Sequence, residues 1–120
     1  MEFEIHTAGA HRVAELRGQG ILIRGTEDAV DLLGNANFQG AESVIVHSEQ
    51  LHEDFFNLKS GIAGDILQKF SNYHMKLAIV GDYKELSSKS LRDFIYESNK
   101  RKQIIFSADL NEAIEQLTGT

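Results

Sequence analysis

Three polar side chains that could do acid–base chemistry follow short apolar runs in this sequence. They are His47, Asp82 and Ser107. A carboxylate and an imidazole at adjacent strand ends could form the orienting pair of a hydrolase. No G-x-S-x-G nucleophile elbow, G-x-G-x-x-G turn or P-loop accompanies them. A small-ligand or enzyme site at these three residues is therefore one hypothesis, with no catalytic motif behind it.

Histidines and carboxylates in the same region also raise the question of a metal site. His47, His52, Asp54 and Asp82 carry the imidazoles and carboxylates that bind zinc or iron. However, His47 and His52 are separated across a loop, and this spacing gives them no common face. The sequence therefore predicts neither a metal nor a cofactor.

A second candidate surface lies at the start of a helix that we expect over about 57–72. Gly61 and Gly64 would lie inside this helix, where each glycine costs about 1 kcal/mol relative to alanine. One explanation is that the glycines let the helix pack tightly on its own sheet. The other is that they form a smooth docking patch for a partner protein.

The docking hypothesis gives roles to the neighbouring polar residues. Ser60 would lie in the centre of the patch, with Asp54 and Lys59 at its rim. A phosphate on Ser60 would meet the free N–H groups at the helix N-terminus and bring nearly two negative charges to the patch. Phosphorylation of Ser60 would then block the partner.

The elements that must position these residues follow from the hydrophobic pattern. Residues 2–6 alternate between polar and apolar, and with residues 11–16 they predict an N-terminal hairpin at a sheet edge. The runs 43–46, 77–80 and 104–106 are apolar without alternation, which is typical of parallel strands covered on both faces.

Amphipathic segments separate these strands. We expect helices from Thr26 to Gly34, over about 57–72, over about 89–101 and around 110–117, while the pattern leaves residues 21–23 undecided. This order predicts a single α/β domain over residues 1–120. It has a mixed, mostly parallel sheet of four or five strands, an antiparallel N-terminal edge and four helices.

Composition excludes several classes of protein. The 120 residues include no cysteine, which excludes disulfides and thiolate metal sites, and their net charge of -6 disfavours nucleic-acid binding. No apolar stretch is long enough to span a membrane, and the first four residues are acidic and alternating rather than basic and then apolar. We therefore expect a cytoplasmic protein.

Three segments carry a family resemblance: DFFNLKSGIAGDILQKF at 54–70, LAIVGD at 77–82 and SKSLRDFIYESN at 88–99. They resemble the uncharacterised bacterial family catalogued as domain of unknown function 4180, over most of the chain. The resemblance implies a small stand-alone bacterial protein and brings no established activity with it.

The order of elements more remotely resembles the STAS domains, the class of anti-sigma factor antagonists. In that class a serine followed by a glycine begins the helix after the central strand, and phosphorylation by a partner kinase switches binding. Ser60 and Gly61 match this pair, whereas Leu58 and Lys59 stand where the class has Asp and Ser. The resemblance implies a regulatory role for Ser60.

We therefore expect a non-enzymatic, cytoplasmic binding and regulatory module. Its partner is a protein that docks at Asp54, Lys59, Ser60, Gly61 and Gly64. The alternative is a small-ligand or enzyme site at the strand ends. Self-association through an edge strand or the same helix, giving a homodimer, is a third hypothesis.

Overall fold

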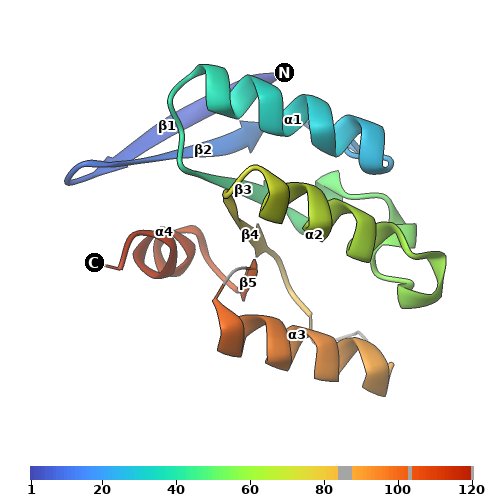
Figure 1. Cartoon of the computed structure of the whole chain (residues 1–120). Helices are drawn as coiled ribbons and strands as arrows, with labels where there is room; N and C mark the ends of the chain where they lie inside the picture. Colours follow the sequence, from blue (N-terminus) through green and yellow to red (C-terminus); the bar gives the residue numbers. More distant parts are fainter. Residues whose placement is uncertain (84–87, 103, 120) are drawn as a thin grey trace.

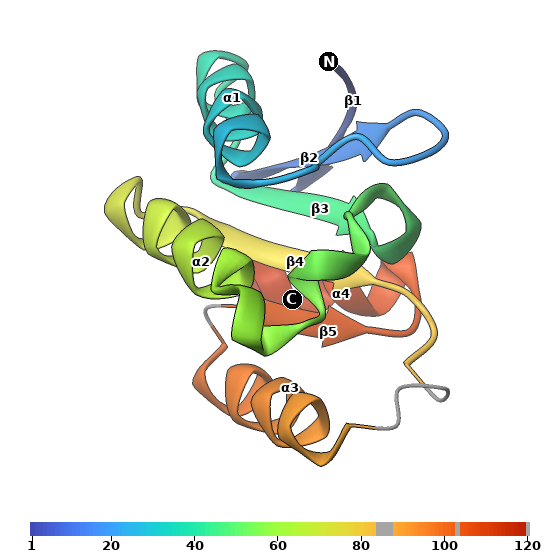
Figure 2. The same cartoon turned by 90° about the vertical axis from the view of Figure 1, so that its right-hand side faces the viewer.

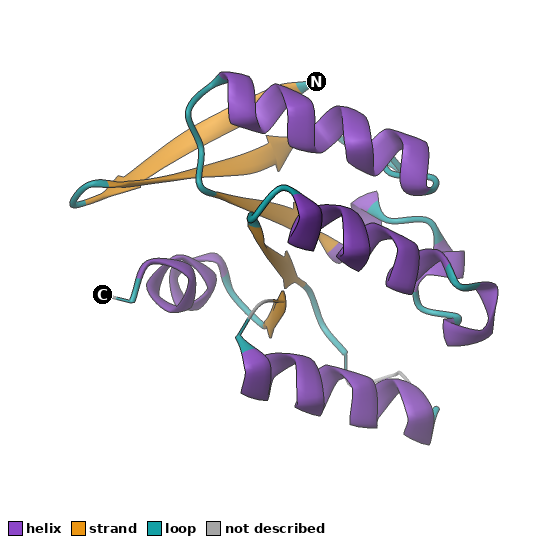
Figure 3. Cartoon of the chain, viewed as in Figure 1, coloured by secondary structure: helices purple, strands orange, loops and turns teal. Residues whose placement is uncertain are grey.

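A computed structural model of the chain describes residues 1–83, 88–102 and 104–119. This part of the chain contains five strands that form one sheet and four α-helices (Figures 1 and 3). The strands are β1 (Glu2–Ala8), β2 (His11–Arg17), β3 (Ser43–His47), β4 (Lys76–Val80) and β5 (Ile104–Ser107). The helices are α1 (Thr26–Phe38), α2 (Ile62–Asn72), α3 (Lys89–Arg101) and α4 (Leu110–Thr118).

The sheet has the strand order β1-β2-β3-β4-β5. β1 pairs with β2 antiparallel, and the remaining neighbours pair parallel. Each crossover from β2 to β5 therefore leads to the adjacent strand in the same direction. Because such crossovers are right-handed, α1, α2 and α3 all lie on one face of the sheet, and α4 lies on the other (Figure 1). The predicted α/β fold with an antiparallel N-terminal edge is confirmed.

Two hydrophobic cores hold these layers together. The larger core joins the sheet to α1 and α2, with Leu32, Leu33, Ile66 and Phe70 among its buried residues. The smaller core joins the other face of the sheet to α4. Its buried members are Val13, Ile45, Ala78, Val80, Ile105, Ala113 and Leu117. The apolar runs of the central strands serve both cores, as their lack of alternation predicts.

The helix expected over about 57–72 was predicted with the wrong start. Leu58–Ser60 forms a 3₁₀ turn, and α2 begins only at Ile62. Gly61 separates them because its φ of 79° is left-handed, a conformation that glycine adopts without a steric penalty. Gly61 is therefore not inside a helix, and of the two glycines only Gly64 is.

Two further details concern α1 and the segment before it. The helix was expected to end at Gly34 but continues to Phe38, because Leu33 and Ala36 are both buried against the sheet and carry the apolar stripe past the glycine. The undecided segment 21–23 makes only a single bridge, between Ile23 and Leu51.

In the described part of the chain, no helix has the length and apolar character needed to cross a membrane.

Candidate functional site

The three strand-end residues lie at one edge of the sheet but not at one point. His47 ends β3 and Ser107 ends β5, while Asp82 is exposed and follows β4. In the strand register Val80 lies between His47 and Ser107, so their Cα atoms are two strand spacings, about 10 Å, apart.

Ser107 has a structural role. It is 2% exposed, and its Oγ donates a hydrogen bond to the carbonyl oxygen of Asp109, 2.9 Å away. Asp109 in turn caps α4 by accepting from the N–H of Glu112. The hydroxyl of Ser107 is therefore engaged within its own turn, at the start of α4.

His47 instead points toward a buried carboxylate in β2. Its Nε2 lies 2.6 Å from Oε2 of Glu15, which is 1% exposed. Nε2 of His6, in β1, lies 2.8 Å from Oε1 of the same carboxylate. Around this centre, Arg17 Nη1 lies 3.3 Å from Glu15 Oε2 and Glu4 Oε2 lies 3.2 Å from His6 Nε2. We call these five residues the carboxylate–histidine cluster.

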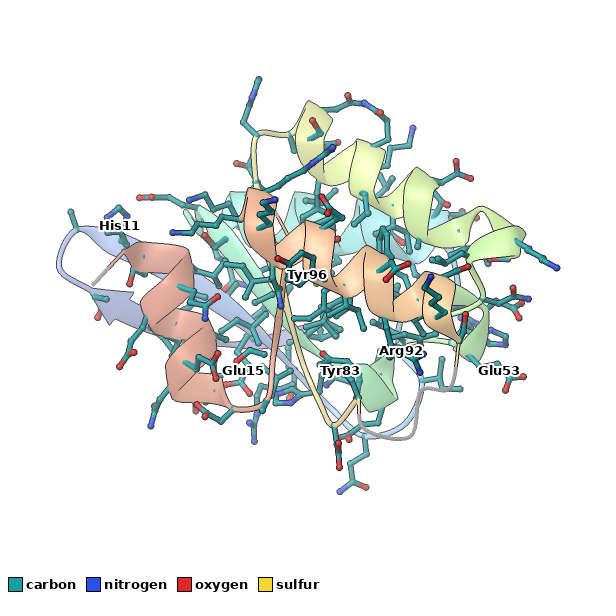
Figure 4. All side chains as sticks on the ribbon, turned by 90° about the horizontal axis from the view of Figure 1, so that it is seen from below. His11, Glu15, Glu53, Tyr83, Arg92 and Tyr96 are labelled. Atoms are coloured by element: carbon teal, nitrogen blue, oxygen red, sulfur yellow. The ribbon has the colours of Figure 1, made fainter. Side chains whose placement is uncertain are left out.

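The sheet itself brings the cluster together. Glu4 and Glu15 face each other across the antiparallel pair of β1 and β2. Glu15 shares a face with Val13 of the same strand, and Val13 belongs to the core beneath α4, because alternate residues of a strand point to the same side. The same alternation places His47 on the side of Ile45. Figure 4 shows Glu15 on the side of the sheet where α4 lies.

Burial and hydrogen bonding shift the pKa of the Glu15 carboxyl in opposite directions. Burial by itself raises the pKa of the Glu15 carboxyl, while hydrogen bonds and charge from His47 and His6 lower it, and the net result is a pKa below the usual value. Glu15 is therefore a carboxylate at neutral pH. Because a carboxylate can only accept, both imidazoles present an N–H to it.

Sequence reasoning singled out His47 but not its partners. Glu15 lies in the predicted second strand, two residues after Val13. A charged residue on the same face as a core valine is the available signal, because such a residue needs a buried partner. The sequence gives no comparable signal that His6 and His47, from two other strands, are those partners.

On the opposite face of the sheet, residues of α2 and α3 line a groove. Figure 2 shows the two helices on that face. It has a volume of about 590 Å³. Its apolar lining comes from Leu67, Phe94 and Ile104. The remaining lining residues are Gly64 and Gln68 from α2 and Ser90, Asp93, Glu97, Ser98 and Arg101 from α3.

Gly64 is the predicted docking residue that lies in this groove. A Cβ added to Gly64 would meet nothing within 4 Å in the described part of the chain. The glycine is therefore not required for packing of α2 on its own sheet. This finding removes the first of the two explanations for a glycine inside this helix.

The other predicted docking residues lie before α2. Asp54, Lys59 and Ser60 belong to 3₁₀ turns, and Gly61 links the last turn to the helix. The exposed Ser60 donates a hydrogen bond from Oγ to the carbonyl oxygen of Asp54, at 2.7 Å, and accepts one from the N–H of Ile62, at 3.2 Å. Ser60 therefore joins the turns to the first residue of α2.

One comparison with known proteins gives a match. The model of the family described as "Domain of unknown function (DUF4180)" matches residues 8–117. No curated protein and no solved structure matches the chain.

Proposed function

The chain belongs to the DUF4180 family, and we propose that it is a non-enzymatic module that docks a protein partner in the groove between α2 and α3. The proposal rests on Gly64, which lies in the groove and has open space where a side chain would project. As part of the proposal, the module is regulatory and acts in the bacterial cytoplasm, as the resemblances in the sequence imply.

Gly64 supports docking because the fold itself does not need it. A glycine in a helix interior lowers stability by about 1 kcal/mol relative to alanine. Close approach of another backbone is the usual reason to keep one, and a Cβ on Gly64 would meet nothing within 4 Å in the described part of the chain. A backbone that needs this glycine would therefore belong to another molecule.

The lining of the groove indicates the chemistry of that molecule. Leu67 and Phe94 are half-buried and offer apolar contacts. Asp93 and Glu97 lie one helical turn apart on α3, and among the described residues neither has an ion-pair partner. The partner segment that fits is an amphipathic helix with an apolar stripe toward Leu67 and Phe94 and lysine or arginine at its flank.

Ser60 lies two residues before the start of α2 and is suited to a regulatory role. Its hydroxyl is exposed and donates to the carbonyl oxygen of Asp54. A phosphate on Ser60 would remove that donor proton and place about two negative charges at the beginning of α2. As part of the proposal, this modification changes the turn that leads into α2 and weakens docking.

A photo-crosslinking experiment tests the proposal. A photoreactive residue replaces Gln68 in the groove or, as a matched control, Gln116 on α4, in the full chain in its native cells. Docking predicts an adduct from position 68 but not from position 116, and the crosslinked segment carries apolar and basic residues. Substitution Gly64→Trp should then lower the adduct yield at least tenfold.

Three results would contradict the proposal. They are equal adducts from both positions, an adduct between two copies of this chain, and a crosslinked segment without basic residues. Purified wild-type chain and the Gly64→Trp variant should show the same circular dichroism spectrum. This control separates a blocked groove from a damaged fold.

A further inference from the structure

On the α4 side of the sheet, we infer that Glu4, His6 and Glu15 form a binding site for one first-row divalent metal cation such as Zn²⁺ or Mn²⁺. The potential ligand atoms of these three residues lie within 4.8 Å of one another. The inference is independent of the groove, because it concerns other residues on the opposite face of the sheet.

Two of the three distances between the ligand atoms are already within the range found around a metal ion, and all three atoms lie within 4.8 Å of one another. Nε2 of His6 lies 2.8 Å from Oε1 of Glu15 and 3.2 Å from Oε2 of Glu4. Ligands about 2.0–2.2 Å from an ion at angles of 90–110° lie about 2.8–3.6 Å from each other. A cation between these atoms therefore needs only small side-chain movements.

The charges at the site also favour a cation. Two carboxylates, from Glu4 and Glu15, converge on a single imidazole nitrogen of His6. One N–H cannot donate fully to both carboxylates, so the pair carries more negative charge than His6 itself balances. A divalent cation at this position balances both carboxylates and binds Nε2 of the neutral imidazole, whose single proton then lies on Nδ1.

The second oxygen of Glu15 is held by residues that would orient the metal ligand. His47 Nε2 lies 2.6 Å and Arg17 Nη1 3.3 Å from Oε2, while Oε1 faces His6. Hydrogen bonds of this kind fix a ligating carboxylate and typically change metal affinity by about 10- to 100-fold. His47 and Arg17 are therefore positioning residues for Glu15.

The mixture of ligands and the exposure of the site define the class of metal. One imidazole and two carboxylates suit zinc, manganese or ferrous iron better than a soft ion such as Cu(I). Glu15 lies at the bottom of the site, whereas Glu4 is 56% exposed. Three protein ligands and an open outer side leave coordination positions for water or a small anionic ligand.

The test is titration of tag-free, chelator-treated full-length protein with Zn²⁺ by calorimetry and with Co²⁺ by visible absorption. We expect one ion per chain and a d–d absorption band that shows a protein-ligated cobalt. The His6→Ala variant should weaken Zn²⁺ binding at least 100-fold, and Glu4→Gln at least 10-fold. The matched control is His11→Ala, whose imidazole faces the exposed Glu42 near the hairpin turn, and it should bind Zn²⁺ like the wild type.

The positioning role of His47 is tested by the Zn²⁺ affinities of two variants, one that keeps a hydrogen-bond donor and one that does not. The His47→Gln variant keeps an N–H that can donate to Glu15, and we expect it to bind Zn²⁺ within about threefold of the wild type. The His47→Ala variant should bind about tenfold more weakly. Loss of affinity in both variants alike, or in neither, would overturn the positioning role.

Two results would overturn the site itself. The first is a wild-type protein that binds no Zn²⁺ at micromolar concentrations. The second is Zn²⁺ binding that survives both His6→Ala and Glu4→Gln in variants with wild-type circular dichroism spectra. Both substitutions are at partly or largely exposed side chains, so the variants are expected to fold.

Discussion

Each face of the sheet carries one feature that packing of the fold does not require, and the two features differ in kind. On the face of α1, α2 and α3, a side chain is missing: Gly64 leaves open space beside a groove. On the face of α4, a charge is present where an apolar residue would suffice: Glu15 is buried with His6 and His47 as partners. Functional sites are where such departures are expected.

The two regions also differ in the chemical groups that they present. The groove presents a helix backbone and three apolar side chains and is suited to packing against a protein segment. The carboxylate–histidine cluster brings charged groups from β1, β2 and β3 within hydrogen-bond distance and is suited to holding a proton or a cation. Substitutions in the groove should therefore cost little stability, whereas removal of the buried carboxylate of the cluster should cost more.

Neighbouring residues of α2 give the largest expected contrast in stability. Ile66 is 2% exposed in the core, whereas Leu67 lines the groove. We expect Ile66→Ala to lower the free energy of unfolding by about 3 kcal/mol and Leu67→Ala by about 1 kcal/mol or less. Urea denaturation measures both. Equal losses would show that the groove wall belongs to the core.

The buried carboxylate should give the next largest effect. Removing Glu15 leaves the imidazoles of His6 and His47 without their acceptor, so we expect Glu15→Ala to lower the free energy of unfolding by about 2 kcal/mol. The control is Glu49→Ala, at an exposed carboxylate, with an expected change within about 0.5 kcal/mol. If both variants unfold at the same urea concentration, the cluster does not contribute to stability.

The two glycines at the start of α2 should respond in opposite directions to alanine. Gly61 has a φ of 79°, so Gly61→Ala should lower the free energy of unfolding by about 1 kcal/mol. Gly64 lies inside the helix with open space around it, so Gly64→Ala should raise the free energy by about 0.5–1 kcal/mol. Thermal denaturation measures the sign of each change. A loss of stability in Gly64→Ala would contradict the proposal that this glycine is kept for a partner.

The acidic edge of the groove should give the smallest effect on the fold. The double variant Asp93→Lys, Glu97→Lys changes two side chains that have no ion-pair partner among the described residues. We expect a stability change within about 0.5 kcal/mol and a loss of at least tenfold in adduct yield from position 68. A normal adduct yield would show that the partner is not recognised by its positive charge.

Much of the fold could be predicted from the sequence because its signals are local. The runs 43–46, 77–80 and 104–106 indicated buried parallel strands, and the alternation of residues 2–6 indicated the edge hairpin. The start of α2 could not be predicted from amphipathic spacing, since that spacing continues across Gly61. Only the backbone geometry shows that the glycine is left-handed.

The candidate sites were harder to predict because they depend on contacts between distant residues. The sequence placed Gly64 in a helix but could not show that it lines a groove with residues of α3. It marked His47 at a strand end but could not show that Glu15, 32 residues earlier in the chain, lies 2.6 Å away. Parallel register brings these residues together, and register is not readable from composition or spacing.

The most direct test of the central claim compares stability and docking in one pair of variants, Gly64→Ala and Gly64→Trp. We expect neither variant to unfold at a lower temperature than the wild type. We also expect adduct formation from position 68 to fall as the side chain grows and to be lost in Gly64→Trp. Two results would contradict docking at Gly64. One is a loss of the adduct that accompanies unfolding at a lower temperature, and the other is an undiminished adduct in Gly64→Trp.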